Sequence, residues 1–290
     1  CAMNRASTPD TIELELKLGL RDCDPSKVSN VLNSVLGREI ASKTELLQNI
    51  YFDSAGLLHR AGVAIRTRSV NTSHEMTVKI REPDEGGLSQ RREWNFPIDT
   101  PNLDYALLER LDLPISVVSV IREQSLEVVF QNAFERTDWH VTEDNCDVMV
   151  SLDLGSVQVD GRESQVSELE LELLSGDIDQ LIRLGCEVAD QLPAFMGVIS
   201  KAERGDRLIR EADPMAEPIP VTREHWLHWL SRALDPLSGP APDEAVRALE
   251  AIGDQQAISF YRDSLRRGEL PKGLARWMIS QSLESMNAAS

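Results

Sequence analysis

The sequence predicts an α+β protein: an eight-stranded antiparallel β-barrel with surrounding helices, followed by a small C-terminal helical region. Three observations lead to this fold class. Between residues 11 and 213, apolar and polar side chains alternate with a period of two, as in half-buried strands. Turn sequences of hairpin length separate several of these segments, at 53–56, 84–87 and 160–161. From residue 214 onward, the apolar residues recur with a helical period instead.

The alternating segments are predicted to form eight strands. In chain order they are Thr11–Leu18, Glu45–Asp53, Gly62–Val70, His74–Glu82, Leu88–Pro97, Leu126–Val141, Asp147–Val159 and Gln165–Leu174. Strands joined by such short links pair antiparallel. An open sheet would leave two strand edges exposed, and closure into a barrel removes both.

Helices are predicted between the strands and in the tail. Those of the first part are Asp24–Leu36, Leu103–Leu111 and Asp177–Gln191. Asp24 followed by Pro25 is typical of a helix start, because the carboxylate caps free backbone N–H groups and proline suits the first turn. Those of the tail are Thr222–Leu234, Asp243–Arg267 and Lys272–Leu283. Three prolines within 213–220 predict a linker, so we expect one domain over residues 3–213 and a helical domain or extension over 214–290.

The composition excludes several classes of protein. The 290-residue chain has 41% hydrophobic and 27% charged residues, which is typical of a folded globular protein and too apolar for a disordered one. No uncharged stretch is long enough for a membrane span. With 48 acidic against 30 basic residues, the net charge is −18. We therefore expect neither nucleic acid nor an anionic membrane as a partner, since both attract basic surfaces.

The cysteines and the N-terminus point to an ordinary intracellular protein. Cys1, Cys23, Cys146 and Cys186 are far apart and form no C-x-x-C pair, so neither a zinc knuckle nor a redox motif is predicted. Residues 1–9 lack the apolar core of a signal peptide. We expect free thiols, a natural start at Met3 and a cytoplasmic location.

The charged side chains follow one face of each predicted strand. In residues 12–18 every odd position is charged and every even position is aliphatic, and residues 168–173 repeat this alternation with three glutamates. Cations alternate in the same way on other strands, at Arg66, Arg68, Lys79, Arg81, Arg91 and Arg136. Like charges about 6–7 Å apart repel by ~2–3 kcal/mol at an effective dielectric constant of about 20. Inside a barrel, a row of glutamates therefore needs cations facing it.

The opposite faces decide which way the charges point. Leu14, Leu16, Leu171 and Trp94 are too apolar to remain in water, so we expect them to pack on the surrounding helices. The charges then line a polar tunnel, with carboxylates on one wall and Arg and Lys on another. Carboxylates without His or Cys suit Mg²⁺ or Mn²⁺. A polyphosphate is the ligand that matches both a hard metal ion and several fixed cations.

These residues resemble a known family. Glu13-x-Glu15-x-Lys17 is similar to the E-x-E-x-K signature of the CYTH superfamily, the triphosphate tunnel metalloenzymes. The similarity continues in order to about residue 210, through Arg66-x-Arg68, Lys79, Arg91-x-Glu93, Arg136, Asp153, the Glu-rich last strand and Ser200-Lys201-Ala202-Glu203-Arg204-Gly205. The chain is identified as a member of this superfamily, and it resembles the bacterial inorganic triphosphatases within it.

The resemblance implies roles for the charged residues. The ligands of Mg²⁺ or Mn²⁺ would be Glu13, Glu15, Asp153, Glu170 and Glu172. The triphosphate would be held by Lys17, Arg66, Arg68, Lys79, Arg91, Arg136 and Lys201. The catalytic group would comprise Glu13, Glu15, Lys17, Glu170 and Glu172. Three roles stay open: Glu168 shares the face of the metal ligands, Glu93 either joins the metal shell or buffers neighbouring arginines, and Arg204 either helps hold the helix of Lys201 or is a surface cation.

The leading hypothesis is metal-dependent hydrolysis of inorganic triphosphate to pyrophosphate and phosphate. Three alternatives are open. A class IV adenylyl cyclase, or a thiamine or nucleoside triphosphatase, uses the same tunnel but needs a pocket for an organic group. A non-catalytic polyphosphate-binding module would not need the full group of carboxylate metal ligands.

The tail adds no clear function, and the sequence does not indicate a protein partner. It is shorter and less basic than the CHAD domains appended to related triphosphatases. His225 and His228 are spaced for a metal site, but Trp226, Trp229, Leu230 and Ala233 favour an apolar stripe that packs on neighbouring helices.

Overall fold

A computed structural model describes residues 11–81, 89–143, 145–210, 222–235 and 241–287 of the chain. The predicted turn at 84–87 and the predicted linker at 213–220 lie outside these residues. Among the described residues, no helix is long and apolar enough to cross a membrane. The three described cysteines, Cys23, Cys146 and Cys186, carry free thiols as expected.

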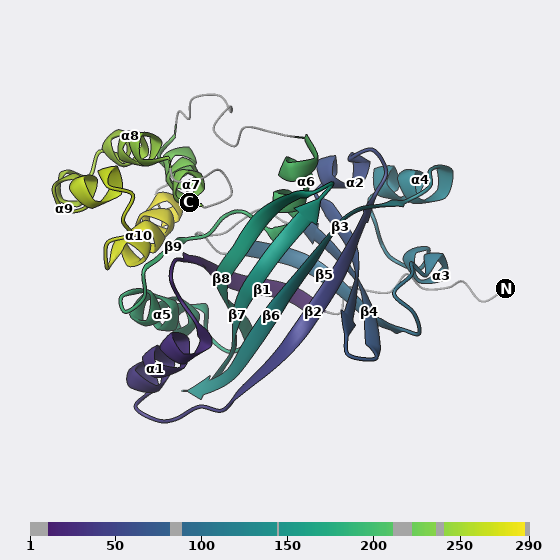
Figure 1. The fold of residues 1–290 in the computed structure, drawn as a ribbon, viewed down its shortest axis with the longest axis horizontal. Helices are drawn as coiled ribbons and strands as arrows, with labels where there is room; N and C mark the ends of the chain where they lie inside the picture. Colours follow the sequence, from purple (N-terminus) through teal and green to yellow (C-terminus); the bar gives the residue numbers. More distant parts are fainter. Residues whose placement is uncertain (1–10, 82–88, 144, 211–221, 236–240, 288–290) are drawn as a thin grey trace.

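The strands form a closed antiparallel barrel, which confirms the predicted fold class (Figure 1). They are β1 (Thr11–Leu20), β2 (Ser42–Asp53), β3 (Val63–Val70), β4 (Ser73–Arg81), β5 (Ser89–Ile98), β6 (Glu127–Glu143), β7 (Cys146–Val159) and β8 (Arg162–Ser175). Their order is β5-β4-β3-β2-β6-β7-β8-β1, and β1 pairs back with β5. A short strand that the sequence analysis missed, β9 (Ala194–Met196), pairs with the end of β1 beyond its contact with β5.

The apolar faces of the strands point outward and are covered by helices. Leu16, Leu18 and Leu171 are buried in one hydrophobic cluster with α1 (Pro25–Leu36), α5 (Ile178–Ala189) and the tail helices. On other strands, Trp94 and Ile65 belong to a second cluster with α2 (Leu57–Arg60), α3 (Tyr105–Leu108) and α4 (Ile115–Glu123). Figure 1 shows these two groups of helices on opposite sides of the barrel. The charged faces are therefore left to line the interior.

The ends of α1 follow the predicted chemistry. Its N-cap Asp24 accepts a hydrogen bond from the backbone N–H of Lys27 at 2.9 Å, and Gly37 ends the helix with a φ of 63°. The predicted helix Leu103–Leu111 is too long, because α3 covers only Tyr105–Leu108. The sequence analysis did not predict α4, which begins after Pro114.

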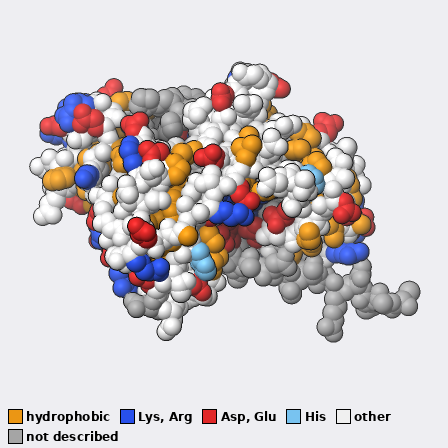
Figure 2. Space-filling model, turned by 60° about the horizontal axis from the view of Figure 1, so that its bottom comes forward, with side chains coloured by type: hydrophobic (Ala, Val, Ile, Leu, Met, Phe, Trp, Pro, Cys, Tyr) orange, Lys and Arg blue, Asp and Glu red, His pale blue; other side chains and the backbone are white. Residues whose placement is uncertain are grey.

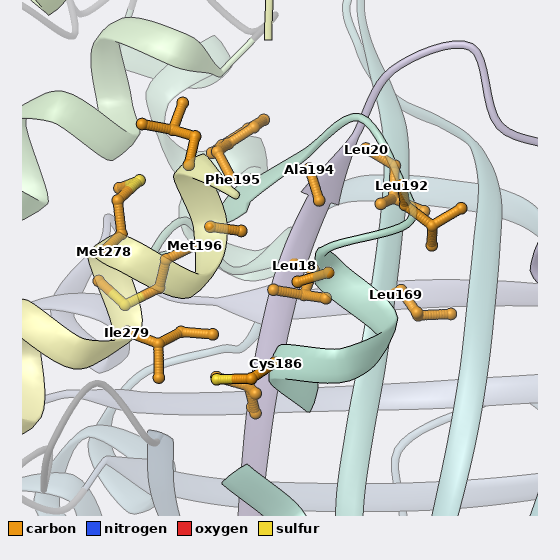
Figure 3. Close-up of a cluster of buried hydrophobic side chains, with 14 of the residues drawn as sticks. Leu18, Leu20, Leu169, Cys186, Leu192, Ala194, Phe195, Met196, Met278 and Ile279 are labelled. Atoms are coloured by element: carbon orange, nitrogen blue, oxygen red, sulfur yellow. The ribbon is translucent and has the colours of Figure 1, made fainter. Parts of the chain in front are cut away.

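The tail forms four helices, α7 (Arg223–Leu234), α8 (Pro242–Ile252), α9 (Gln255–Arg266) and α10 (Leu274–Asn287). The single helix predicted over Asp243–Arg267 is wrong, because Gly253, with a φ of 84°, ends α8 and Asp254 caps α9. Figure 3 shows Met278 and Ile279 of α10 beside Met196 of β9. The tail thus packs on the outside of the barrel in one continuous cluster. The division into domains 3–213 and 214–290 stays a prediction.

Candidate functional site

The interior of the barrel encloses a charged cavity of about 370 Å³. Figure 2 shows acidic and basic side chains meeting in a hollow near the middle of one face. The structure brings eleven of the residues named from the sequence to the wall of this cavity: Glu13, Glu15, Lys17, Arg66, Arg68, Lys79, Arg91, Arg136, Glu170, Glu172 and Lys201. Asp153 is fully buried behind the wall, where it contacts Arg136 and Lys201.

The register of β1 explains why the signs alternate in the cavity. Glu13 lies opposite Arg91 of β5, and Lys17 lies opposite Glu170 of β8. Each of these pairs brings opposite charges together across a strand boundary, which offsets the repulsion within each strand. Glu15 is the exception, because its neighbour on β8 is Glu172.

One acidic wall combines Asp153, Glu168 and Glu170. Among the described residues, these three form the group of carboxylates compact enough for a metal ion, with one oxygen of each within 4.8 Å of the others. Glu168, left open in the sequence analysis, therefore belongs to this cluster. Arg136 binds Asp153 through two hydrogen bonds of 2.7 and 2.6 Å and contacts Glu170 at 2.6 Å. Lys201 bridges all three carboxylates.

The ion pairs control ionisation in this wall. Burial raises the pKa of Asp153 and of Glu170, but the neighbouring cations together outweigh it and hold each pKa below its ordinary value. Lys201 and Arg136 act on both carboxyls, and Lys17 acts on Glu170 as well. Both carboxyls are therefore charged at neutral pH. They can therefore pair with or coordinate cations, and neither carries a proton that it could donate.

A second acidic region lies between β1, β4 and β5. Lys79 contacts Glu13 at 2.6 Å and Glu93 at 3.0 Å, and Arg91 contacts Glu15 at 2.8 Å. Glu93 thus neutralises a neighbouring cation, here a lysine. Glu172 differs: burial first, and then the nearby Glu13, raise the pKa of Glu172 to about 7. This region therefore has more negative charge than its own cations compensate.

The wall of the cavity that carries Arg66 and Arg68 has more positive charge than nearby carboxylates compensate. Within the described residues, Arg66 and Arg68 form no ion pair with a carboxylate. Arg68 donates from Nε to the side-chain Oδ1 of Asn49 at 2.9 Å, and the Nε of Arg66 is buried without a hydrogen-bond partner. Burial, then Arg66 and Arg136, lower the pKa of Arg68 to about 9. Both guanidinium groups line the cavity.

The sequence analysis missed two aromatic residues, Tyr51 on the cavity wall and Phe134 beside Lys201. Tyr51 stacks on Phe130 with ring centroids 4.3 Å apart. Ile50 and Phe52 flank it, so the alternation could not show which face of β2 is inside. The ring of Phe134 is 5.0 Å from the ammonium of Lys201. Because Phe134 lies two residues before Arg136, strand periodicity could have placed it on the same face of β6.

The remaining open residues are also placed. Arg204 is buried and pairs with Asp235 of the tail at 2.8 Å, so it is not a surface cation. His59 lines the cavity and lies 3.3 Å from Asp206, whereas His74 bonds to Ser69 and His140 is exposed beside Asp147.

The donor set fits a hard divalent cation. The cavity and its wall offer carboxylate oxygens from Glu13, Glu15, Asp153, Glu170 and Glu172, and Mg²⁺ and Mn²⁺ prefer such oxygen ligands. Burial raises the pKa of Glu172 most, and the nearby Glu13, Glu93 and Glu15 raise it further, so a cation placed among these carboxylates would interact favourably with them.

Comparisons with known proteins agree with this geometry. The CYTH domain model matches residues 11–205. An inorganic triphosphatase from Haemophilus influenzae is 28% identical over 167 residues, which cover 55% of this chain and 45% of that protein. The chain thus matches less than half the length of this curated relative.

Solved structures resemble the chain more distantly. An adenylyl cyclase candidate from Hippeastrum, described as having a dominant triphosphatase activity, is 21% identical with a TM-score of 0.46, covering 72% of this chain and 98% of that one. An adenylate cyclase candidate from Bacillus halodurans is 13% identical with a TM-score of 0.40, covering 67% and 96%. Because the identities are below 25% and the TM-scores below 0.5, we draw no conclusion about activity from these structures.

Proposed function

The chain belongs to the CYTH domain family, and from this premise we propose that it hydrolyses inorganic triphosphate to pyrophosphate and phosphate inside the barrel, with a divalent metal ion. The observation that carries the proposal is the charge imbalance of the cavity. Arg66 and Arg68 face it without carboxylate partners, while Glu172 lies among like charges on the other side. A polyanion together with a metal cation compensates both imbalances.

The chain's own cations would hold the substrate. Arg66 and Arg68 offer guanidinium forks that match phosphate oxygens, and Arg136, Arg91 and the three lysines Lys17, Lys79 and Lys201 add charge around them. Enclosure by the barrel fixes the triphosphate along the cavity and keeps out most water, which strengthens these contacts. The rigid strands supply the positioning that phosphoryl transfer requires.

The carboxylates proposed to hold metal are Glu13, Glu15, Asp153, Glu170 and Glu172. Glu168 joins Asp153 and Glu170 in the cluster whose oxygens lie close enough together for one ion. When bound, Mg²⁺ or Mn²⁺ would neutralise charge on the phosphate oxygens and help deliver water. In the structure, Glu13, Glu15 and Glu170 are paired with Lys79, Arg91 and Lys201. Carboxylates that turn to the metal leave these cations free to bind phosphate.

A second cavity favours one alternative substrate class. It measures about 190 Å³, has mostly apolar walls that include Phe52, Val129 and Ile209, and shares Tyr51 and His59 with the tunnel. An organic group attached to a triphosphate would find apolar contacts there. Hydrolysis of such an organic triphosphate is therefore the second candidate function.

Phosphate release from inorganic triphosphate, ATP and thiamine triphosphate tests the proposal, with Mg²⁺ or Mn²⁺ present. We expect the highest kcat/KM for inorganic triphosphate. A preference for either organic substrate would support the second candidate, and cyclic AMP from ATP would identify a cyclase. Release from none of them would leave a polyphosphate-binding module.

Glu170→Gln supplies the matched variant for this assay. Removing the charge should lower kcat/KM by about 100-fold or more, because a carboxylate that holds the metal ion is lost. Glu163→Gln is the control, since Glu163 lies exposed on the same strand. Circular dichroism checks that both variants fold, and full activity of folded Glu170→Gln would contradict the assigned metal site.

A further inference from the structure

We propose that α7 of the tail positions the two tunnel lysines Lys201 and Lys17 for triphosphate binding, through Arg204–Asp235 and through Ser231. This inference rests on the proposed function. It assigns a role to a region for which the sequence indicated none, and it makes Arg204, Asp235 and Ser231 positioning residues that do not themselves contact the substrate.

The first connection is a buried ion pair between α6 (Lys201–Arg210) and the end of α7. The guanidinium of Arg204 donates two hydrogen bonds to the carboxylate of Asp235, at 2.8 and 2.9 Å. Their side chains are only 4% and 6% exposed. A buried bidentate pair tolerates little displacement, because separation leaves each charge without its partner in a poorly solvated place. The pair therefore fixes α6 relative to α7.

Lys201 depends on the placement of α6 because it is the first residue of that helix, three positions before Arg204. Its ammonium lies 2.6 Å from Asp153 and 3.0 Å from Glu170. A shift of α6 would move the backbone from which Lys201 reaches these carboxylates. On the same helix, a Cβ added to Gly205 would lie 2.4 Å from the ring of Phe130, so α6 also sits directly against the barrel.

The second connection runs from α7 through β9 to β1. The hydroxyl of Ser231 is buried and donates to the carbonyl oxygen of Met196 at 2.5 Å. The next residue, Gly197, donates its N–H to the carbonyl oxygen of Lys17 at 2.9 Å. A Cβ added to Gly197 would lie 3.1 Å from Cγ of Lys17, so this backbone packs on the aliphatic stem of the lysine. Ser231 thereby supports the strand segment that confines the Lys17 side chain.

Both connections begin within the last turn of α7 and its C-cap. The first ends at the helix that carries Lys201, and the second ends at the backbone and aliphatic stem of Lys17. Lys17 and Lys201 contact the same two carboxylates, Glu168 and Glu170. The tail thus supports one end of the cationic site from outside the barrel. Small changes in position at such a site alter binding strongly, because the charges must match a fixed spacing of phosphate oxygens.

A double-mutant cycle between Asp235→Asn and Lys201→Met tests the proposal in the full chain. The readouts are the dissociation constant of imidotriphosphate, a slowly hydrolysed analogue of triphosphate, measured by calorimetry with Mg²⁺, and the separate kcat and KM for triphosphate. We expect Asp235→Asn to weaken binding about tenfold and to raise KM more than it lowers kcat. In the Lys201→Met background, the same change should alter binding by less than about twofold.

Controls separate positioning from general stability. Asp190→Asn removes the ion pair between Arg276 of α10 and Asp190, 2.7 Å apart, which joins the tail to the region of α5 without touching α6. It should leave binding unchanged. If Asp235→Asn does not fold, Arg204→Lys takes its place in the cycle, since it keeps the charge and loses the second hydrogen bond.

The outcomes are distinct. Equal loss of binding from Asp235→Asn with and without Lys201 overturns the inference and leaves the proposed function intact. If the folded Asp235→Asn protein binds the analogue as tightly as the unaltered protein does, the inference is also overturned and the proposed function is again unaffected. If the unaltered protein binds no analogue and hydrolyses no triphosphate, both the proposed function and the inference are overturned.

Discussion

At the scale of single residues, the arginines of the tunnel differ in whether their charge is compensated. Arg136 has two carboxylate partners, Asp153 and Glu170, at 2.6 Å each. Arg68 is close to Arg66 and Arg136, and its pKa is lowered to about 9 by burial and by these neighbours. Keeping Arg68 charged therefore opposes folding of the ligand-free protein, whereas Arg136 stabilises it.

This difference predicts opposite effects of two similar substitutions. Arg68→Met should raise the melting temperature of the ligand-free protein by about 2–4 °C, because it removes an uncompensated buried charge. It should also weaken triphosphate binding about 10–100-fold, since a guanidinium contact to phosphate is lost. Differential scanning fluorimetry and calorimetry measure the two effects.

Arg136→Met is the matched comparison. It should lower the melting temperature, because Asp153 and Glu170 would lose a cation partner in the buried wall. A fall in melting temperature for Arg68→Met as large as that for Arg136→Met would show that the charge of Arg68 is compensated after all.

At the scale of elements, the close packing of β6 on β7 depends on a glycine. A Cβ added to Gly155 would lie 2.3 Å from the Ala133 carbonyl oxygen and 2.5 Å from Cα of Phe134. These are backbone atoms, which cannot turn away as a flexible side chain can. The same stretch of β6 carries Phe134, whose ring contacts Lys201.

Gly155→Ala should therefore separate the two strands locally and destabilise the barrel by about 2 kcal/mol or more. Urea unfolding measures the change in free energy. Ser156→Ala, one residue further along β7, should change it by less than about 0.5 kcal/mol. Equal stability of the Gly155→Ala protein would mean that β6 and β7 pack less closely than described.

The junction of α8 and α9 depends on Asp254. Its carboxylate accepts hydrogen bonds from the N–H groups of Ala257 and Gln256, at 3.1 and 3.0 Å, and from the indole of Trp277 at 2.9 Å. The bond from Ala257, then that from Trp277, lower the pKa of Asp254 below its ordinary value of 3.8. The ionised form thus stabilises the fold above the ordinary pKa, and this stabilisation is lost as the pH falls through the lowered value.

Asp254→Asn keeps the cap but does not titrate. The difference in unfolding free energy between the unaltered protein and this variant should therefore shrink as the pH falls from about 6 to about 3. Urea unfolding over this range measures it. A difference that stays constant with pH would show that the charge of Asp254 contributes nothing.

At the scale of the whole molecule, an acidic protein encloses a cavity with many cationic side chains on its wall. The net charge is −18, yet eight cationic and seven acidic side chains are described along the cavity wall. The barrel separates this interior from the acidic surface. In the structure, carboxylates of the cavity pair with Lys79, Arg91 and Lys201, which are among the cations proposed to hold triphosphate.

Removal of metal ions should therefore stop the proposed reaction. We expect EDTA to lower the rate of phosphate release by about 100-fold or more, and Mg²⁺ or Mn²⁺ to restore it. K⁺ at matched ionic strength should not restore it. Mg²⁺ should also raise the melting temperature, since it binds the folded state. Full activity in EDTA would exclude the metal-dependent reaction.

The sequence predicted the strands well because period-two alternation is a local property. It failed at α4, where Ile115–Glu123 is rich in valine and isoleucine and has a weak helical preference. That segment is helical because Val117 and Ile121 are buried against the outside of the barrel. It also missed β9, since three residues are too few to show a period.

The sequence by itself determined which side chains share a face, and therefore which residues could line the tunnel, because residues i and i+2 project together in any strand. Only the tertiary structure decided their partners. Lys17 meets Glu168, 151 residues away, because β1 pairs with β8 on closure of the barrel. Arg204 meets Asp235 because α6 packs on the tail. Such contacts depend on strand register and helix placement, which no local pattern encodes.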